Sequence, residues 1–201
     1  MPDYAEGNPE GYLFPATYTI TPQDTPASIL RDMVDRWKQA AADLDLEAAA
    51  AEIGFEPHEI MTVAALVQAE GREPDMPKIA RVVYNRLENP GTAGQAGFLQ
   101  IDATVDYALG RPLTVGLTQE ERENTQSPYN TFVNKGLPPG PIGNPGEAAI
   151  SAALSPAQGD WYYYVTVNLR TGKTKFAETY EEFQQYVAEL REYCDTKSDA
   201  C

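Results

Sequence analysis

The chain has 201 residues, 42% of them hydrophobic, and a formal net charge of −15, so it suits a single domain with a substantial core. The negative charge argues against nucleic acid or an anionic membrane surface as a partner, because both attract clustered Lys and Arg. No apolar run is long enough to span a bilayer and no basic, apolar leader follows Met1, so neither a membrane span nor a signal peptide is expected.

The N-terminal third begins with a Gly- and Pro-rich segment that becomes β-prone at Tyr18–Ile20. Thr25 is expected to cap a helix with Pro26 in its first turn. A shorter helix is expected over 46–53, ending before a glycine. The first helix has a predicted buried stripe made of Ile29, Leu30, Met33, Val34 and Trp37.

The next predicted helix carries an acidic residue on its apolar face. Pro57 suits its first turn, and good helix formers follow up to Gly71. Its apolar residues recur at spacings of three and four, and Glu70 continues their stripe. Those residues are Ile60, Val63, Leu66 and Val67. A partly desolvated Glu has a raised pKa, as a general acid needs. The alternative is a last-turn Glu that turns into solvent.

The middle of the chain mixes one further helix with loops. Asp75 is expected to cap a helix whose buried face is Ile79, Val82, Val83 and Leu87. Residues 89–97 are predicted as a flexible loop, and 109–127 is polar with few core candidates. Four prolines and four glycines make 136–146 a rigid, extended loop. Asn144 and Pro145 are then expected to cap a helix ending near residue 154.

The C-terminal third predicts two strands, over 161–167 and 174–176, joined by a hairpin turn at 170–172. A capping box at 179–182 opens a final helix through Tyr193. Helices and short strands are mixed without βαβ periodicity. The expected fold class is therefore α+β: a single mixed domain of several helices with short strands and a C-terminal β-hairpin plus helix.

The predicted organisation is one domain over 1–193 and a polar, cysteine-containing tail over 194–201. The two cysteines of the chain, Cys194 and Cys201, lie in this tail and in no C-x-x-C motif, and His58 is the single histidine. No metal site and no cofactor are therefore expected. The two thiols are either free at the surface or joined in a disulfide that closes a small terminal loop.

Five stretches of the chain, taken together and in order, resemble the endolytic murein transglycosylase (YceG-like) family. They are EGYLFPATY at 10–18, AALVQAEGREPDMPKIARVVYNRLE at 64–88, LQIDATVDYALG at 99–110, SPYNTFVNKGLPPGPIGNPG at 127–146, and the final YYYV…F…T…EEF. The resemblance covers nearly the whole chain. It implies the catalytic domain of a bacterial cell-wall enzyme.

The family's catalytic residue is the second acidic position of a V-E-x-E-like helix motif. Here the motif stands as Val67–Glu70, so the resemblance assigns catalysis to Glu70, with Gln68 at the first acidic position. A further departure is Lys175, where many relatives carry His. Family members normally begin with a cytoplasmic tail, a transmembrane helix and a LysM-like subdomain. The resemblance thus implies a membrane-anchored protein whose catalytic domain, the part matched here, is soluble and works at the extracytoplasmic face of the bacterial cytoplasmic membrane.

The resemblance also implies a reaction. The family cuts the bond between N-acetylmuramic acid (MurNAc) and N-acetylglucosamine (GlcNAc) inside peptidoglycan strands and leaves 1,6-anhydroMurNAc ends. One Glu first protonates the leaving oxygen and then deprotonates the muramic C6 hydroxyl, so no metal or second catalytic carboxylate is required. Expected partners are peptidoglycan glycan strands and cell-wall synthases, with no nucleic acid, and an expected role is to end glycan strand elongation. A disulfide between Cys194 and Cys201 is expected in exported protein.

Seven polar residues are candidates for substrate binding or for orienting Glu70. They are Asn85, Gln100, Asp102, Thr104, Tyr129, Asn130 and Thr131. Gln100, Asp102 and Thr104 would share one face if 99–104 is extended. Local turn capping is the alternative for the pair at 130–131, a helix end for Asn85, and a structural hydrogen bond for Asp102. The aromatic residues Tyr12, Phe14 and Tyr18 either stack on sugars or, as we favour, lie in the core.

Two other functions stay open from the sequence. If Asp102 acts as a second catalytic carboxylate, the chain is a peptidoglycan hydrolase (muramidase). A non-catalytic wall-binding scaffold of the synthesis machinery is the alternative from another class. Glu70 on an apolar stripe speaks against the scaffold, because a binding module has no need of a desolvated acid.

Overall fold

A computed structural model describes residues 1–93, 96–113 and 117–197. Its central element is α3 (Pro57–Glu70), which starts at the predicted proline and has a capping box formed by Glu56 and Glu59. The predicted stripe is buried, and the residues between its positions are buried as well: all eight residues from Ile60 to Val67 are buried. The helix is therefore enclosed on all sides along these two turns, rather than amphipathic.

Four helices pack around α3: α2 (Leu46–Glu52), α4 (Met76–Glu88), α5 (Asp102–Ala108) and α7 (Glu147–Leu154). The predicted apolar face of α4 is buried at Ile79, Val82 and Val83. Close to its centre, the hydroxyl of Tyr84 donates to the carbonyl of Ala153 at 2.8 Å. This bond satisfies the one polar group of a fully buried ring and joins α4 to α7.

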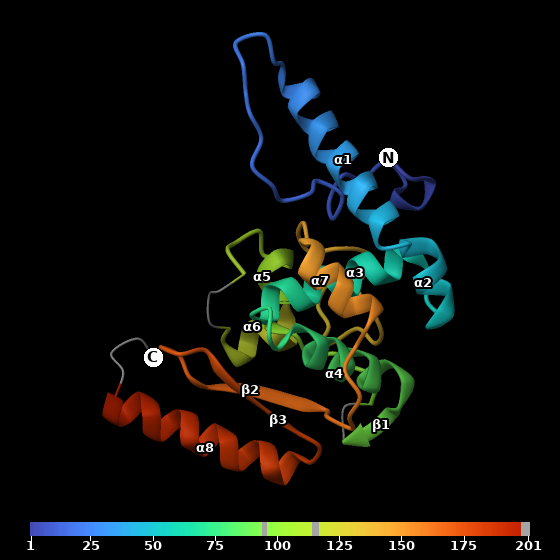
Figure 1. Cartoon of the computed structure of the whole chain (residues 1–201). Helices are drawn as coiled ribbons and strands as arrows, with labels where there is room; N and C mark the ends of the chain where they lie inside the picture. Colours follow the sequence, from blue (N-terminus) through green and yellow to red (C-terminus); the bar gives the residue numbers. More distant parts are fainter. Residues whose placement is uncertain (94–95, 114–116, 198–201) are drawn as a thin grey trace.

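A short 3-10 helix, η1 (Asp3–Ala5), precedes a segment that leads out to α1 (Pro26–Asp43). The predicted Thr25 cap is present, as a capping box with Ser28. The predicted buried stripe of α1 is wrong in part: Leu30 is 48% exposed, whereas Trp37 is buried. Figure 1 shows why, because the first half of α1 and the segment before it extend away from the helical body. The β-prone stretch around Ile20 lies in this extension and forms no strand.

The C-terminal layer is the predicted hairpin and helix. Strands β2 (Tyr163–Asn168) and β3 (Lys173–Ala177) pair antiparallel, with Tyr164 opposite Phe176. That face packs on the main core, whereas the opposite face packs with α8 (Tyr180–Lys197). In Figure 1 the sheet lies between α8 and the helical body. The α+β fold class is confirmed.

The face turned toward α8 carries Lys175, one of the two residues that depart from the family pattern. Lys175 forms an ion pair with Glu189, and its ammonium lies 4.6 Å from the centre of the Tyr186 ring. Its side chain thus serves the contact between the sheet and α8.

The predicted loop over 89–97 is wrong in part, and the polar stretch 109–127 contains a helix that the sequence analysis did not place. A short strand, β1 (Pro90–Ala93), lies in the segment expected to be a loop, and α6 (Gln119–Asn124) lies in the polar stretch 109–127. The sequence did carry a signal for α6, since Thr118 and Glu121 form a capping box. Asp75 takes the N-cap position of α4 without a side-chain cap bond.

Two further differences concern helix ends. Gly146, and not Asn144, takes the N-cap position of α7. At the other end of the chain α8 continues past Tyr193 to Lys197, so the start of the predicted tail is helical. Cys201 lies outside the described residues, and its pairing with Cys194 stays a prediction.

The Pro- and Gly-rich loop over 136–146 contains neither helix nor strand, as predicted, and is bound to the N-terminal motif. The side-chain oxygen of Asn144 accepts from the backbone N–H groups of Gly11 and Leu13 at 2.9 and 3.0 Å. The His58 ring links Tyr12 to the loop: its Nδ1 lies 2.8 Å from the Tyr12 hydroxyl and its Nε2 3.0 Å from the carbonyl of Pro139. The two motifs therefore meet at the start of α3.

The same contact explains one glycine. Gly11 has a φ of +90°, and a Cβ there would lie 2.4 Å from Cγ of Pro141. Gly7 is a matched control, because its φ is +79° and nothing lies within 4 Å of a Cβ. Alanine at either position costs about 1–2 kcal/mol of backbone strain. We predict that Gly11→Ala costs about 1–3 kcal/mol more, from overpacking. Urea unfolding measures both, and an equal loss would contradict the contact.

Candidate active site

Glu70 is the last residue of α3 and lies where three elements meet. Its Oε2 accepts a hydrogen bond from the hydroxyl of Tyr164, on β2, at 2.8 Å. The backbone N–H of Ala103, in the first turn of α5, also bonds to its carboxyl group. The following Gly71 lets α4 approach closely, since a Cβ there would lie 2.2 Å from Cδ1 of Ile79. Glu70, which continues the apolar stripe of α3 in the sequence, thus places its carboxyl group at the edge of the core.

The surroundings of Glu70 act on its pKa in opposite directions, with a net increase. Burial raises the pKa most, and the Asp102 carboxylate raises it further. The Tyr164 hydroxyl, the Ala103 N–H and the Arg86 guanidinium lower it, because each stabilises the ionised form. The acid is therefore favoured at higher pH than usual, while the carboxylate finds two hydrogen-bond donors and a cation already in place. These are the properties of a group that must alternate between acid and base.

Tyr164 was not predicted as a site residue. Burial, then the nearby Glu70, raises its pKa well above the ordinary value, so the phenol stays protonated and acts as a donor. Strand alternation carried a signal: Tyr163 and Tyr164 must face opposite ways, and Tyr163 packs toward α8. The sequence did not indicate which face of the β2–β3 sheet contacts Glu70.

Arg86 was also missed. It is 8% exposed on α4, and burial lowers its pKa from the ordinary value. Its guanidinium donates from Nε to the carbonyl of Tyr162 at 2.8 Å and from Nη1 to the carbonyl of Leu99. It therefore ties together the two chain segments that supply Tyr164 and Ala103. The signal was present, because Arg86 follows Val82 and Val83 at spacings of four and three, as Glu70 follows Leu66 and Val67.

The condition that 99–104 is extended, under which the three polar residues would share one face, is not met, because Asp102 starts the helix α5. Asp102 lies next to the residue that bonds Glu70, and its own carboxylate is paired with Arg122. Gln100 is exposed, with a φ of +52°, just before the helix. The three predicted residues thus do not share one face. Gln100 and Asp102 keep accessible side chains, and Thr104 does not.

Thr104, Asn130 and Thr131 form an internal support for the start of α5, and each is at most 1% exposed. The hydroxyl of Thr131 lies 2.9 Å from that of Thr104 and accepts from the backbone N–H of Ile101 at 3.0 Å. The Asn130 amide donates to the carbonyls of Arg122 and Thr125. Direct sugar contact by these three is therefore corrected to a structural role, since their polar groups are used inside the protein.

Asn85 and Tyr129 complete the predicted set, and Gln68 is the departure in the Glu70 motif. Asn85 is 6% exposed, and its amide donates to the carbonyls of Gly159 and Trp161, so it holds that segment rather than Glu70. Tyr129 is half-buried, with its ring 4.8 Å from that of Tyr107. Gln68 is exposed and accepts from the backbone N–H of Gly146 at 3.1 Å, which fixes the end of the Pro- and Gly-rich loop.

A pocket of about 320 Å³ opens beside Glu70, between the end of α3 and the hairpin. Its lining is Ala69, Glu70, Gly71, Arg72, Thr166, Leu169, Gly172 and Thr174. Arg72 crosses this space, and its guanidinium donates to the carbonyl of Thr171 at 2.7 Å. The volume is at the lower end of the range for ligand pockets, about 300–1,000 Å³. Glu70 thus lines a small hollow whose walls are of mixed polarity.

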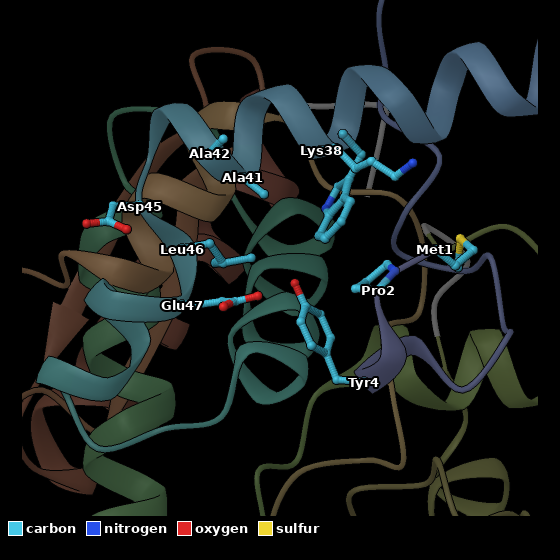
Figure 2. A pocket seen from close by; sticks show the side chains of 10 residues that line it. Met1, Pro2, Tyr4, Lys38, Ala41, Ala42, Asp45, Leu46 and Glu47 are labelled. Atoms are coloured by element: carbon cyan, nitrogen blue, oxygen red, sulfur yellow. The ribbon is translucent and has the colours of Figure 1, made fainter.

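A second hollow, of about 420 Å³, lies between α1, α2 and the N-terminal residues. Figure 2 shows the Tyr4 hydroxyl and the Glu47 carboxylate directed toward each other in it. Burial, and then Glu47, raises the pKa of Tyr4 to about 12. In Figure 1, α1 and α2 lie across the helical body from the sheet that carries Tyr164, so this hollow is separate from the Glu70 pocket.

Within the described ranges, no cluster of three or more His, Cys, Asp or Glu side chains is placed to hold a metal ion. No helix in this part of the chain is both long and apolar enough to cross a membrane.

Comparison with known proteins agrees with this fold. The model of the YceG-like family matches residues 3–189. A crystal structure of a YceG-like protein from Listeria monocytogenes superposes with a TM-score of 0.77 at 37% identity, over 88% of this chain and 55% of that one. The chain belongs to the YceG-like family.

Two curated relatives carry the name endolytic murein transglycosylase. The Bacillus subtilis (strain 168) protein is 35% identical over 175 residues, which is 86% of this chain and 45% of the relative. The Streptococcus pneumoniae (strain D39) protein is 34% identical over 187 residues, which is 90% of this chain and 32% of the relative. The chain therefore spans less than half the length of these relatives.

The hydrogen bond from Tyr164 to Glu70 can be tested by titration. Tyr164→Phe removes a donor to the ionised carboxyl, so we predict that the pKa of Glu70 rises further. Carbon-13 NMR of the labelled carboxyl measures it. Tyr186→Phe is the matched control, because its hydroxyl donates to a different carboxylate, that of Glu182, at 2.6 Å. An unchanged Glu70 titration in Tyr164→Phe would show that the bond does not influence the acid.

Proposed function

We propose that this chain is the catalytic domain of an endolytic lytic transglycosylase that cleaves the MurNAc–GlcNAc bond within peptidoglycan strands. The observation that carries the proposal is the environment of Glu70. It is a single carboxyl with a raised pKa, and it has donors ready for its ionised form. The names of the relatives support the same substrate class.

The proposed reaction uses Glu70 twice. The protonated carboxyl gives its proton to the glycosidic oxygen as the bond to the muramic C1 breaks. The carboxylate, stabilised by Tyr164, Ala103 and Arg86, then takes the proton of the muramic C6 hydroxyl as O6 bonds to C1. One proton has moved from O6 to the leaving oxygen, and no water is consumed. Because the nucleophile belongs to the substrate, its high effective molarity supplies much of the acceleration.

A muramidase would need a second carboxylate to activate water or to attack the sugar. Asp102 is the carboxylate whose charge acts on Glu70, but both of its oxygens are bonded to Arg122. This arrangement favours single-acid chemistry over hydrolysis. A wall-binding scaffold is disfavoured too, since binding requires no desolvated acid with donors aimed at it.

We further propose that the enzyme acts outside the cytoplasmic membrane on nascent glycan strands, ends their elongation, and has cell-wall synthases as partners. The support for this setting is the similarity to the named relatives, which are cell-wall enzymes. A net charge of −15 suits a glycan better than a polyanion such as nucleic acid.

The deciding experiment is mass spectrometry of products released from uncrosslinked glycan strands. We expect 1,6-anhydroMurNAc ends and no reducing MurNAc ends. Products heavier by one water, with a reducing end, would overturn the transglycosylase proposal in favour of hydrolysis. Binding without any product would favour the scaffold.

Glu70→Gln should abolish product formation and leave the fold intact. Gln is nearly isosteric but cannot titrate. Since the folded-state pKa of Glu70 is raised, the wild type loses stability as the pH rises through that pKa, and the variant lacks this loss. As the pH rises, the melting temperature of Glu70→Gln should therefore stay equal to that of the wild type or exceed it. Glu73→Gln, at an exposed position three residues on, is the control and should remain active.

Asp102→Asn should weaken product formation less than Glu70→Gln does, because the proposal gives Asp102 no proton to transfer. Initial rates at the optimum pH of each variant decide the order. A loss in Asp102→Asn as complete as in Glu70→Gln would point to a second catalytic carboxyl.

A further inference from the structure

The Asp102–Arg122 ion pair lies next to Glu70 and has a more constrained geometry than most surface ion pairs. Asp102 is the first residue of α5, and the next residue, Ala103, donates its N–H to Glu70. Arg122 binds Asp102 in a bidentate manner, from Nε to Oδ1 at 3.1 Å and from Nη2 to Oδ2 at 2.8 Å. Such fork-to-fork pairs fix the geometry of both groups.

Arg122 itself is held at both ends. Its carbonyl accepts from the buried amide of Asn130 at 2.9 Å, and its guanidinium lies 5.6 Å from the centre of the Phe132 ring. The Thr118 capping box fixes the start of α6, the short helix that carries it. The side chain is 36% exposed, and yet its position is determined from three directions. A pair that served surface solubility alone would need none of these supports.

On the basis of the transglycosylase activity proposed above, we infer that Arg122 is a positioning residue: it fixes the Asp102 carboxylate beside Glu70 and offsets its charge there. This role has two parts. Both carboxylate oxygens of Asp102 are occupied, which keeps Asp102 from acting as a second base. The negative charge of Asp102 on α5 acts on Glu70 together with the positive charge of Arg122, and not alone.

The charged and titratable groups that face Glu70 come from three elements. Asp102 lies on α5, Arg86 on α4 and Tyr164 on β2. Asp102 is the one of these that raises the pKa of Glu70, and Arg122 is the cation bound to it. Removing the cation should strengthen the action of Asp102, and removing Asp102 should leave the cation alone. The two changes should therefore displace the pKa of Glu70 in opposite directions.

The test is the pH dependence of product formation in Arg122→Gln and Asp102→Asn. Activity requires protonated Glu70 and so falls on the alkaline side of its pKa. We expect this limb to move to higher pH by about 0.5 pH unit or more in Arg122→Gln, and to lower pH in Asp102→Asn. The double variant should lie between them. Arg36→Gln is the matched control: its side chain is 39% exposed, it lies 3.8 Å from Glu147, and its loss changes the net charge equally.

A purely structural role would lower the rates of both variants without opposite shifts, and that result would overturn the inference, as would equal shifts in Arg122→Gln and Arg36→Gln. Carbon-13 NMR titration of Glu70 in the same variants gives the answer without any turnover. If wild type releases no anhydro products, the proposed function fails. The opposite NMR shifts still decide whether Arg122 controls the charge at Glu70.

Discussion

The site depends on the burial of α3 along two turns, since that burial fixes where the helix ends. Because residues from Ile60 to Val67 are buried on every side, α3 cannot rotate or slide without opening the core. Its last residue, Glu70, is thereby held at the point where α4, α5 and the β2–β3 sheet come together. A carboxyl on a loop at the same place would find water instead, and its pKa would return toward the ordinary value.

Around this fixed carboxyl the protein balances two opposing requirements. Desolvation raises the pKa of Glu70 and so favours its protonated form, but desolvation alone would make its carboxylate too costly to form. Tyr164, the Ala103 N–H and Arg86 reduce that cost without moving, because each is held by other contacts. Arg86 is bonded to backbone carbonyls of the two segments that supply the other two groups. One cation thus both stabilises the charge and positions its neighbours.

The two carboxyls of the site differ because their environments differ. Glu70 is desolvated and receives hydrogen bonds from a phenol and a backbone amide, whereas Asp102 is 44% exposed and paired with a guanidinium. Environments that separate two carboxyls in this way assign their roles in glycosidases generally. In the proposed mechanism this separation assigns proton transfer to Glu70, and the buried Thr104, Asn130 and Thr131 keep the start of α5 in place.

The sequence by itself determined most of the local elements and singled out Glu70 as the candidate acid. Proline and capping residues mark the starts of α1 and α3, the hairpin and α8 follow from alternation and a capping box, and helical periodicity alone isolates Glu70. Arg86 stands at the same helical spacing from the apolar residues of α4. Tertiary structure decided the rest. Tertiary contacts decide which residues of the α1 stripe are exposed and that a helix starts at Asp102. A local sequence pattern does not specify which elements will pack against a segment. Sequence spacing likewise does not give the meeting of Tyr164 with Glu70 across 94 positions, or of Arg122 with Asp102 across 20, because these contacts exist only once separate elements have packed.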